Sequence, residues 1–260
     1  MYSVESGPSE HHVLVVSFGG EGVLVSIKKH TNCTDCEQRS TTEWSCLSSG
    51  ELRILDNAKI DHILPVGEII YNQGDRCNGI YCIQSGLIGL RRVDSEGHSV
   101  LMRLINHGET IGYRALLSKS NYMLTAEVMM PSRVCFIARS VIQELLEKNP
   151  ALGMRFLDHS LKQLEDIEDR VIGGETWPVR TRFLHTLLVL YERFGVQESE
   201  GWALDLPISR RDLAELVGTT PETMSRTISA VHSEGLARIQ GRRVIIPNID
   251  AVLDTVPFSH

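Results

Sequence analysis

The stretch Ile208–Val231 limits the possible folds of this chain more than any other, because it has the pattern of two short helices joined by a tight turn. Ser209 followed three residues later by Asp212 forms a capping-box pattern at the start of the first helix. Apolar residues then recur at helical spacing, and Gly218 supplies the conformational freedom that the turn needs. This pattern predicts a helix-turn-helix.

The second helix carries polar side chains where such a motif contacts DNA. Thr220 is a predicted N-cap and Pro221 fits the first helical position. Glu222, Ser225 and Arg226 fall near the start of the helix, away from its apolar stripe. A carboxylate accepts a hydrogen bond from cytosine N4, and arginine donates two to guanine O6 and N7. These residues predict sequence-specific recognition in the major groove.

A hairpin is predicted directly after the second helix. Residues Ala237–Ile246 alternate between apolar and polar around Gln240 and Gly241. A winged helix-turn-helix uses such a hairpin to contact phosphates. The predicted DNA contacts outside the reading helix are therefore Thr220, Arg210, Arg242 and Arg243.

Composition excludes a general electrostatic attraction to nucleic acid. The chain of 260 residues carries a net charge of −7 and 42% hydrophobic residues, enough for two medium domains. Between Leu206 and Ile246, however, six arginines face four acidic residues, so the local charge is +2. The sequence has no membrane-spanning apolar run and no secretory signal, which predicts a cytoplasmic protein.

The rest of the chain divides into three further parts. Residues 1–50 form an N-terminal arm with a cysteine cluster, and their first thirty hold two short β-prone runs split by Gly19-Gly20. Residues 51–148 alternate β-branched runs with glycine turns, which predicts a small jelly-roll-like sensor domain. Residues 149–174 predict a dimerisation helix, and residues 175–260 the DNA-binding domain. The fold class is therefore α+β.

The predicted dimerisation helix begins at Asn149-Pro150 and ends at a hinge at Gly173-Gly174. Its 3–4 spaced seam is typical of a coiled-coil interface, although packing within the monomer is the alternative. Acidic residues beside the seam would repel in a dimer and make it tunable. The seam consists of Met154, Leu157, Leu161, Leu164, Glu168 and Val171.

The order of sensor, long helix and winged helix-turn-helix resembles the cyclic-AMP receptor protein/Fnr family of bacterial transcription regulators. The segment from Glu222 to Arg226 is similar to the Glu-x-x-Ser-Arg of the Fnr branch. The resemblance implies a homodimer on double-stranded DNA that reads a TTGAT-type inverted repeat and acts on RNA polymerase, as an activator in the Fnr manner. It implies that Glu222 contacts cytosine, Ser225 thymine and Arg226 guanine.

Nucleotide-binding members of this family hold the ribose with a glutamate and the phosphate with an arginine. This sequence has Tyr113-Arg114 after Gly112 and Leu124-Thr125 at the later position, so no cyclic nucleotide is expected.

Six cysteines indicate a cofactor site. Cys33 and Cys36 form a C-x-x-C pair followed by Cys46, and three thiolates with a fourth, distant thiolate can hold a [4Fe–4S] cluster. The resemblance to the Fnr branch supplies Cys135 as that fourth ligand. The nine residues between Cys36 and Cys46 exceed the spacing usual in the branch. The C-x-x-C pair alone could instead form a zinc site or a dithiol redox switch.

Other functions lack a matching pattern. Haem sensors occur in the same family, but the spacing of the candidate ligands His11, His12, His30 and His159 does not require haem. Cys77 and Cys82 lie in strand-like sequence, where buried inert cysteines are common. A jelly-roll can host a metal enzyme or bind a small effector, yet no facial metal triad occurs within residues 60–135. The chain is therefore expected not to be an enzyme.

Overall fold

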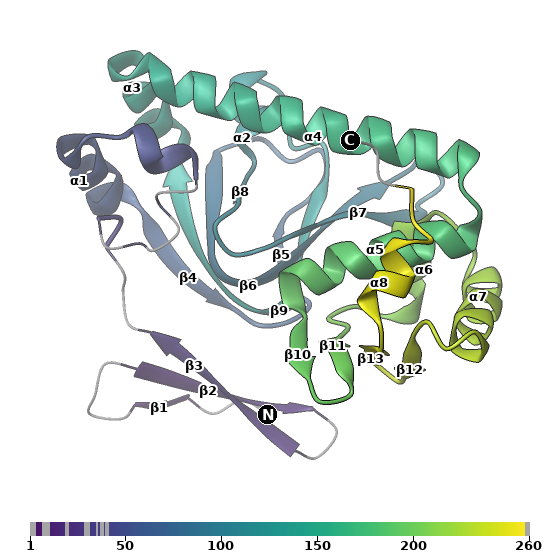
Figure 1. The fold of residues 1–260 in the computed structure, drawn as a ribbon. Coiled ribbons are helices and arrows are strands. Elements are labelled where there is room, and N and C mark those ends of the chain that lie inside the picture. Colours follow the sequence, from purple (N-terminus) through teal and green to yellow (C-terminus); the bar gives the residue numbers. More distant parts are fainter. Residues whose placement is uncertain are drawn as a thin grey trace.

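The computed structural model describes residues 4–6, 11–18, 21–28, 32–34, 36, 39 and 42–257, the first three of these segments by their backbone alone. The sensor region is a curled antiparallel sheet beneath a long helix (Figure 1). Its strands run in the order β4-β9-β6-β7, while β5 also pairs with β9 and β8 with β6. The strands are β4 (Ile60–Leu64), β5 (Ile69–Tyr71), β6 (Gly79–Val93), β7 (Ser99–Ile105), β8 (Thr110–Ile111) and β9 (Thr125–Ala138).

Two long strands, β6 and β9, each cover a stretch that in the sequence resembles two shorter β-prone runs. Their register shifts between Ser85 and Ile88, so the chain bends there without losing its pairing. Gly86 lies at this bend with φ +97°, and a Cβ on it would be 2.1 Å from Ser132 Oγ. Gly86, which in the sequence resembles a turn glycine between two β-prone runs, therefore marks a bulge inside one strand.

The helices of the sensor region include two that the sequence pattern did not reveal, α1 and α3. Their capping differs, because Ser48 and Glu51 form a full capping box before α1, whereas Ala138 precedes α3 without a side-chain cap. Buried leucines from both helices join the core of the sheet. The helices are α1 (Ser49–Ala58), α2 (Tyr113–Leu117), α3 (Arg139–Lys148) and α4 (Pro150–Thr176), preceded by the short 3-10 helix η2 (Glu43–Cys46).

The long helix α4 begins where predicted but continues beyond the predicted hinge. The Asn149 side chain accepts a hydrogen bond from the Ala151 amide, with Pro150 in the first helical position. The prediction that Gly173-Gly174 breaks the helix was wrong, because α4 ends at Thr176. A Cβ on Gly173 would be only 3.2 Å from the Trp177 ring, so this glycine allows the Trp177 ring to pack closely.

The C-terminal region is a winged helix-turn-helix, which confirms the expected fold class. Its sheet has the order β10-β11-β13-β12, and its core includes Leu213, Met224 and Val231. Figure 1 shows this region beside one end of α4. The elements are α5 (Val179–Phe194), β10 (Val196–Glu198), β11 (Gly201–Asp205), α6 (Arg210–Val217), α7 (Pro221–Ser233), β12 (Arg238–Gln240), β13 (Arg243–Ile246) and α8 (Ile249–Leu253).

The N-terminal β-prone runs form an antiparallel pair, β2 (His11–Phe18) and β3 (Glu21–Lys28), with β1 (Val4–Ser6) on the outer edge of β2. Gly19-Gly20 and His30 lie outside the described residues. None of the helices in the described ranges has the length and apolarity needed to cross a bilayer.

Candidate nucleic-acid interface and cysteine site

The helix-turn-helix begins and turns at the residues that the sequence predicts. Ser209 Oγ accepts the Asp212 amide at 3.1 Å, and the Asp212 carboxylate accepts the Ser209 amide at 3.1 Å. Gly218 adopts the left-handed conformation with φ +72°. Thr220 Oγ1 accepts the Thr223 amide at 3.2 Å. These contacts between near neighbours fix where α6 ends and α7 starts.

Helix α7 separates a buried stripe from an exposed polar face. Met224 and Val231 are 1% and 0% exposed and anchor the helix in the domain core. Glu222, Ser225 and Arg226 are all exposed. The three predicted reading residues therefore lie together on the solvent side of the first turns, where they can contact base edges.

The three arginines predicted to contact phosphates, Arg210, Arg242 and Arg243, differ in their contacts within the protein. The Arg243 guanidinium contacts the Glu198 carboxylate at 2.6 Å and Asp205 at 3.4 Å, so acidic groups of the domain neutralise it. Arg210 donates to the Gly241 carbonyl at 3.0 Å and holds the wing turn against α6. Arg242 is exposed at the tip of the hairpin. Of these three predicted phosphate contacts, Arg242 is presented most directly to solvent.

Helix α4 carries an apolar stripe on the side away from the sheet. Its buried face holds Leu152, Phe156 and Gln163, which pack within the monomer. The predicted seam is a different face, on which Glu168 is also exposed. Exposed fractions on that face are 64% for Met154, 48% for Leu157, 51% for Leu161, 49% for Leu164 and 62% for Val171, and the structure adds Ile167 at 38%. Packing within the described monomer therefore does not explain this stripe.

Two of the predicted cysteine ligands face one buried ammonium group. The Lys59 side chain is 1% exposed, lies 3.7 Å from Cys33 Sγ, and is close enough to interact with the charge of Cys135. Cys135 on β9 donates to Asp61 at 3.0 Å and accepts from the Gln84 amide. A positive charge in this place favours the thiolate forms that bind metals.

The remaining two predicted ligands lie on the segment before α1. Cys36 is half-buried, and Cys46 ends η2 with its Sγ 3.4 Å from the Glu43 carbonyl. Over the described part of the chain, no three His, Cys, Asp or Glu side chains are grouped so that they could hold a metal ion. The structure therefore brings Cys33 and Cys135 toward a common charge but does not assemble all four thiols.

Burial controls the ionisation of the thiols. It raises the pKa of Cys33 to about 11, despite the opposing effect of Lys59. Burial, with the hydrogen bond to Asp61, raises the pKa of Cys135 well above its ordinary value. Burial also raises the pKa of Cys82, which is directly opposite Cys135 in the β6–β9 register. These thiols are therefore protonated at neutral pH when nothing is bound to them.

Two family models match the chain, and they fall on the two regions described above. The cyclic nucleotide-binding domain matches residues 62–149, and the Crp-like helix-turn-helix domain matches residues 181–254. Curated relatives that match across both regions include proteins named for transcriptional activation and anaerobic regulation. The chain belongs to the Crp/Fnr family of transcription regulators. A Crp/Fnr regulator binds DNA and is not an enzyme.

Individual relatives of this Crp/Fnr chain match most of its length. A probable transcriptional activator of Rhizobium leguminosarum bv. viciae is 27% identical, over 84% of this chain and 90% of its own. The transcriptional activator protein FnrL of Cereibacter sphaeroides is 26% identical, over 82% and 87%. The structure of FixK2 from Bradyrhizobium japonicum superposes with a TM-score of 0.68 at 21% identity, over 78% of this chain and 99% of FixK2. At that identity the superposition shows the shared fold.

Lys59 and Cys82 were not singled out as functional from the sequence of this Crp/Fnr regulator. Lys59 directly precedes β4, and only the fold shows that it is buried beside Cys33, at 3.7 Å, and Asp56, at 2.8 Å. Cys82 was assigned to inert packing, and its neighbour Cys135 is 53 positions away in the sequence. A lysine beside an apolar strand start is the one local signal that could have pointed to this cluster.

Proposed function

We propose that this Crp/Fnr regulator binds, as a homodimer, an inverted repeat with TTGAT-type half-sites and acts on transcription through RNA polymerase in the cytoplasm. The observation that carries the proposal is the exposed face of α7, where Glu222, Ser225 and Arg226 lie together on a helix fixed by its caps. The exposed stripe of α4 supports the dimer, because two copies can cover each other's apolar side chains. A dimer of this class places its reading helices one DNA turn apart, roughly 34 Å.

We further propose that a [4Fe–4S] cluster, held by Cys33, Cys36, Cys46 and Cys135, makes DNA binding sensitive to oxygen. Such a cluster supplies oxygen-labile redox chemistry. The donor set fits this group, because thiolates are its usual ligands and Lys59 offsets part of their negative charge. The Fnr-type names of several relatives agree with this choice.

The cysteine segment is attached to the dimer helix, which gives the proposed sensor a route to the DNA. The Trp44 ring contacts the Phe156 ring edge-on at 5.8 Å between centroids. The buried Glu43 carboxylate contacts His159 Nδ1 on α4 and accepts from Thr110 at 3.3 Å. A change in η2, which carries Cys46, therefore acts directly on the helix proposed to dimerise.

The surroundings of the thiols and of α2 disfavour two alternatives. A rapid dithiol switch at the C-x-x-C pair needs an accessible thiolate, whereas burial raises the pKa of Cys33 to about 11. For a cyclic nucleotide, Tyr113 occupies the family's carboxylate position, is 3% exposed and stacks on Phe156 at 5.2 Å. We therefore propose that the sensor takes no cyclic nucleotide.

The cluster proposal is tested on protein purified without oxygen. We expect a visible absorption band that air bleaches, bound iron, and operator binding that falls on exposure to air. Cys135→Ser should remove the iron and the band. Cys77→Ser is the matched control, because Cys77 is also a buried thiol, 1% exposed, and its described partners are the Gly79 and Gly112 carbonyls and the Tyr122 hydroxyl, none of them a proposed ligand. Colourless wild-type protein without iron that binds the operator fully would overturn the proposal.

Base recognition is tested by two arginine substitutions in the same domain. Arg226→Ala should cost about 1–3 kcal/mol at the guanine of the half-site and relax the preference there. Arg242→Ala should weaken binding to all sequences alike and reduce the salt dependence by about one phosphate contact. Binding measured by fluorescence anisotropy over a set of single-base operator variants separates the two effects. An unchanged base preference in Arg226→Ala contradicts its assigned role.

A further inference from the structure

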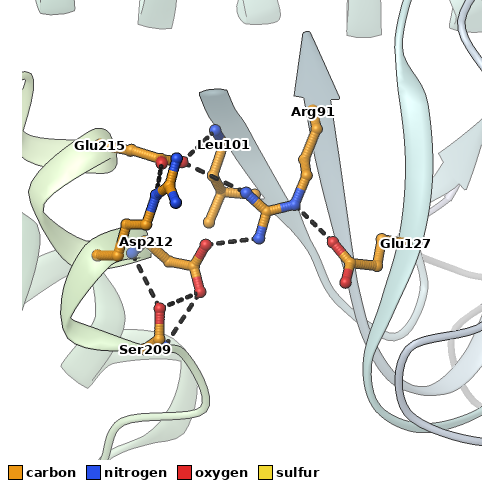
Figure 2. A network of polar contacts seen from close by, with 7 residues as sticks. Arg91, Leu101, Glu127, Ser209, Asp212 and Glu215 are labelled. Atoms are coloured by element: carbon orange, nitrogen blue, oxygen red, sulfur yellow. Dashed lines mark hydrogen bonds and ion pairs between the residues drawn. The ribbon is translucent and has the colours of Figure 1, made fainter. Parts of the chain in front are cut away.

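One arginine of the sensor sheet binds acidic side chains from both domains. Arg91 is on β6, and each of its guanidinium nitrogens contacts a different carboxylate (Figure 2). Nε lies 2.5 Å from Glu127 on the neighbouring strand β9. Nη2 lies 2.5 Å from Asp212, and Nη1 lies 3.3 Å from Glu215, both on α6 of the helix-turn-helix. The Arg91 side chain is only 17% exposed, so this cluster is largely removed from water.

A β-bulge in the sensor sheet completes the contact. The β6–β7 register shifts beside Arg91, so that Arg91 is opposite Leu101 while Leu90 is opposite Arg103. The Leu101 amide donates to Glu215 at 2.8 Å. The carbonyl of Met102, the extra residue of the bulge, accepts from Arg170 on α4 at 2.6 Å. The bulge thus directs backbone groups of β7 to the DNA-binding domain and to the dimer helix.

The two carboxylate oxygens of Asp212 contact groups from different domains. Its Oδ2 accepts the Ser209 amide and hydroxyl in the cap of α6, while its Oδ1 contacts Arg91. Burial alone would raise the pKa of Asp212, but the hydrogen bonds from Ser209 and Arg91 outweigh burial and lower it. The residue that completes the capping box of the first helix of the DNA-binding motif is therefore also the residue that contacts the sensor.

The ionic cluster borders an apolar contact between the same elements. Leu87, Leu101 and Leu104 of the sensor sheet belong to the hydrophobic cluster that contains Leu213 and Val217 of α6. Arg170 adds a second polar bridge, since it also donates to the Leu216 carbonyl at 3.3 Å. Sensor sheet, dimer helix and α6 therefore meet at one junction. Arg91 is the cation that links all three carboxylates, and Arg211 on α6 is a second partner of Glu215 at 3.1 Å.

We propose that Arg91, through Asp212 and Glu215, is a latch that fixes the orientation of the helix-turn-helix on the sensor and keeps it ready for DNA. The latch engages α6, whereas Glu222 and Arg226 on α7 stay exposed and outside it. Removing Arg91 leaves three carboxylates in a half-buried space, with Arg211, paired to Glu215 at 3.1 Å, as their described cation. The remaining repulsion should separate α6 from the sheet. The sensor would then no longer fix the orientation of the helix-turn-helix. The role in DNA binding rests on the proposed function, whereas the latch itself does not.

The experiment compares the full-length protein with Arg91→Met, using Arg92→Met as the matched control. Arg92 is the next residue on the same strand, points to the other face and is exposed, so it undergoes the same change of charge outside the junction. Glu215→Gln is a second variant, which keeps the side-chain volume and leaves the cap at Ser209 intact. Hydrogen exchange is measured without DNA on peptides that cover β7 and α6. Anisotropy then gives the operator affinity and its salt dependence.

We expect faster exchange at Leu101 and in α6 for Arg91→Met and Glu215→Gln, and wild-type exchange for Arg92→Met. Operator affinity should fall about tenfold in Arg91→Met without a change in salt slope, because no phosphate contact is removed. Unchanged exchange in both junction variants would overturn the latch. Faster exchange with unchanged or tighter operator binding would overturn its role in readying the domain for DNA. If the wild type fails to bind the TTGAT repeat, the proposed half-site is wrong, while the exchange comparison still decides the latch.

Discussion

Replacing Leu161 by alanine measures directly whether the exposed stripe of α4 is a dimer interface. The Leu161 side chain is 51% exposed in the monomer. Full burial of a leucine contributes about 1.5–3 kcal/mol, so covering the exposed half contributes about 1 kcal/mol. In a two-fold symmetric dimer the residue occurs twice, which gives about 2 kcal/mol per dimer. Alanine retains little of this area, and the dimer Kd should rise by about 10–30-fold.

Sedimentation equilibrium of the full chain over a range of concentrations gives this Kd. Lys162→Ala is the control on the adjacent helix position, because its side chain is 69% exposed and only forms a surface ion pair with Asp158. Such pairs contribute about 0–1 kcal/mol, and Lys162→Ala should therefore leave the Kd within about threefold. Equal Kd values for the wild type and Leu161→Ala, with helicity unchanged, would refute the assignment of this stripe to the dimer.

Three further outcomes follow from local geometry. Gly86→Ala should destabilise the fold by about 3 kcal/mol, because the added Cβ meets Ser132 Oγ. Gly218→Ala should cost about 1 kcal/mol, because φ is similarly positive but nothing lies within 4 Å of the added Cβ. Urea unfolding measures both. Asp212→Asn should destabilise the fold by about 1–2 kcal/mol at pH 7 and by less toward pH 3. The reason is that the pKa of Asp212 is lowered in the folded protein. Such a carboxyl stabilises the fold above its ordinary pKa and loses this effect as the pH falls through its folded pKa. Added salt should lower the dimer Kd, because it screens the repulsion between the exposed acidic clusters at residues 165–169 of the two protomers. A dimer Kd that rises with salt contradicts this repulsion.

Elements that depend on near neighbours could be predicted from the sequence. Ser209, Thr220 and Asn149 each cap a helix through contacts no more than three residues away. The side chain and its backbone partner are adjacent in the chain, so the pattern itself contains the interaction. The reading face of α7 follows from the same local periodicity.

Features that depend on distant partners could not be predicted in this way. The bend of β6 at Gly86 resembles a strand end until its pairing with β9 is known. Arg91 precedes Asp212 by 121 residues, and no pattern around either residue indicates the other. Lys59 likewise acquires its position beside Cys33 only through the fold, in which α1 and β4 pack on β9. The sequence therefore predicts the chemistry of the cysteines better than their arrangement.

Helix α4 has contacts with each of the three parts that the proposed regulation connects. His159 holds the segment that carries Cys46, through Glu43, and Arg170 holds β7 and α6. His159 and Arg170 are eleven positions apart, about 16 Å along the helix, and the apolar stripe centred on Leu161 and Leu164 lies along the same length. Because a hydrogen-bonded helix of this length moves as a unit, a shift at His159 also moves the stripe and the Arg170 bridge. In the proposed function, the cysteine segment, the second protomer and the helix-turn-helix are therefore coupled through this one helix, without a separate path for each.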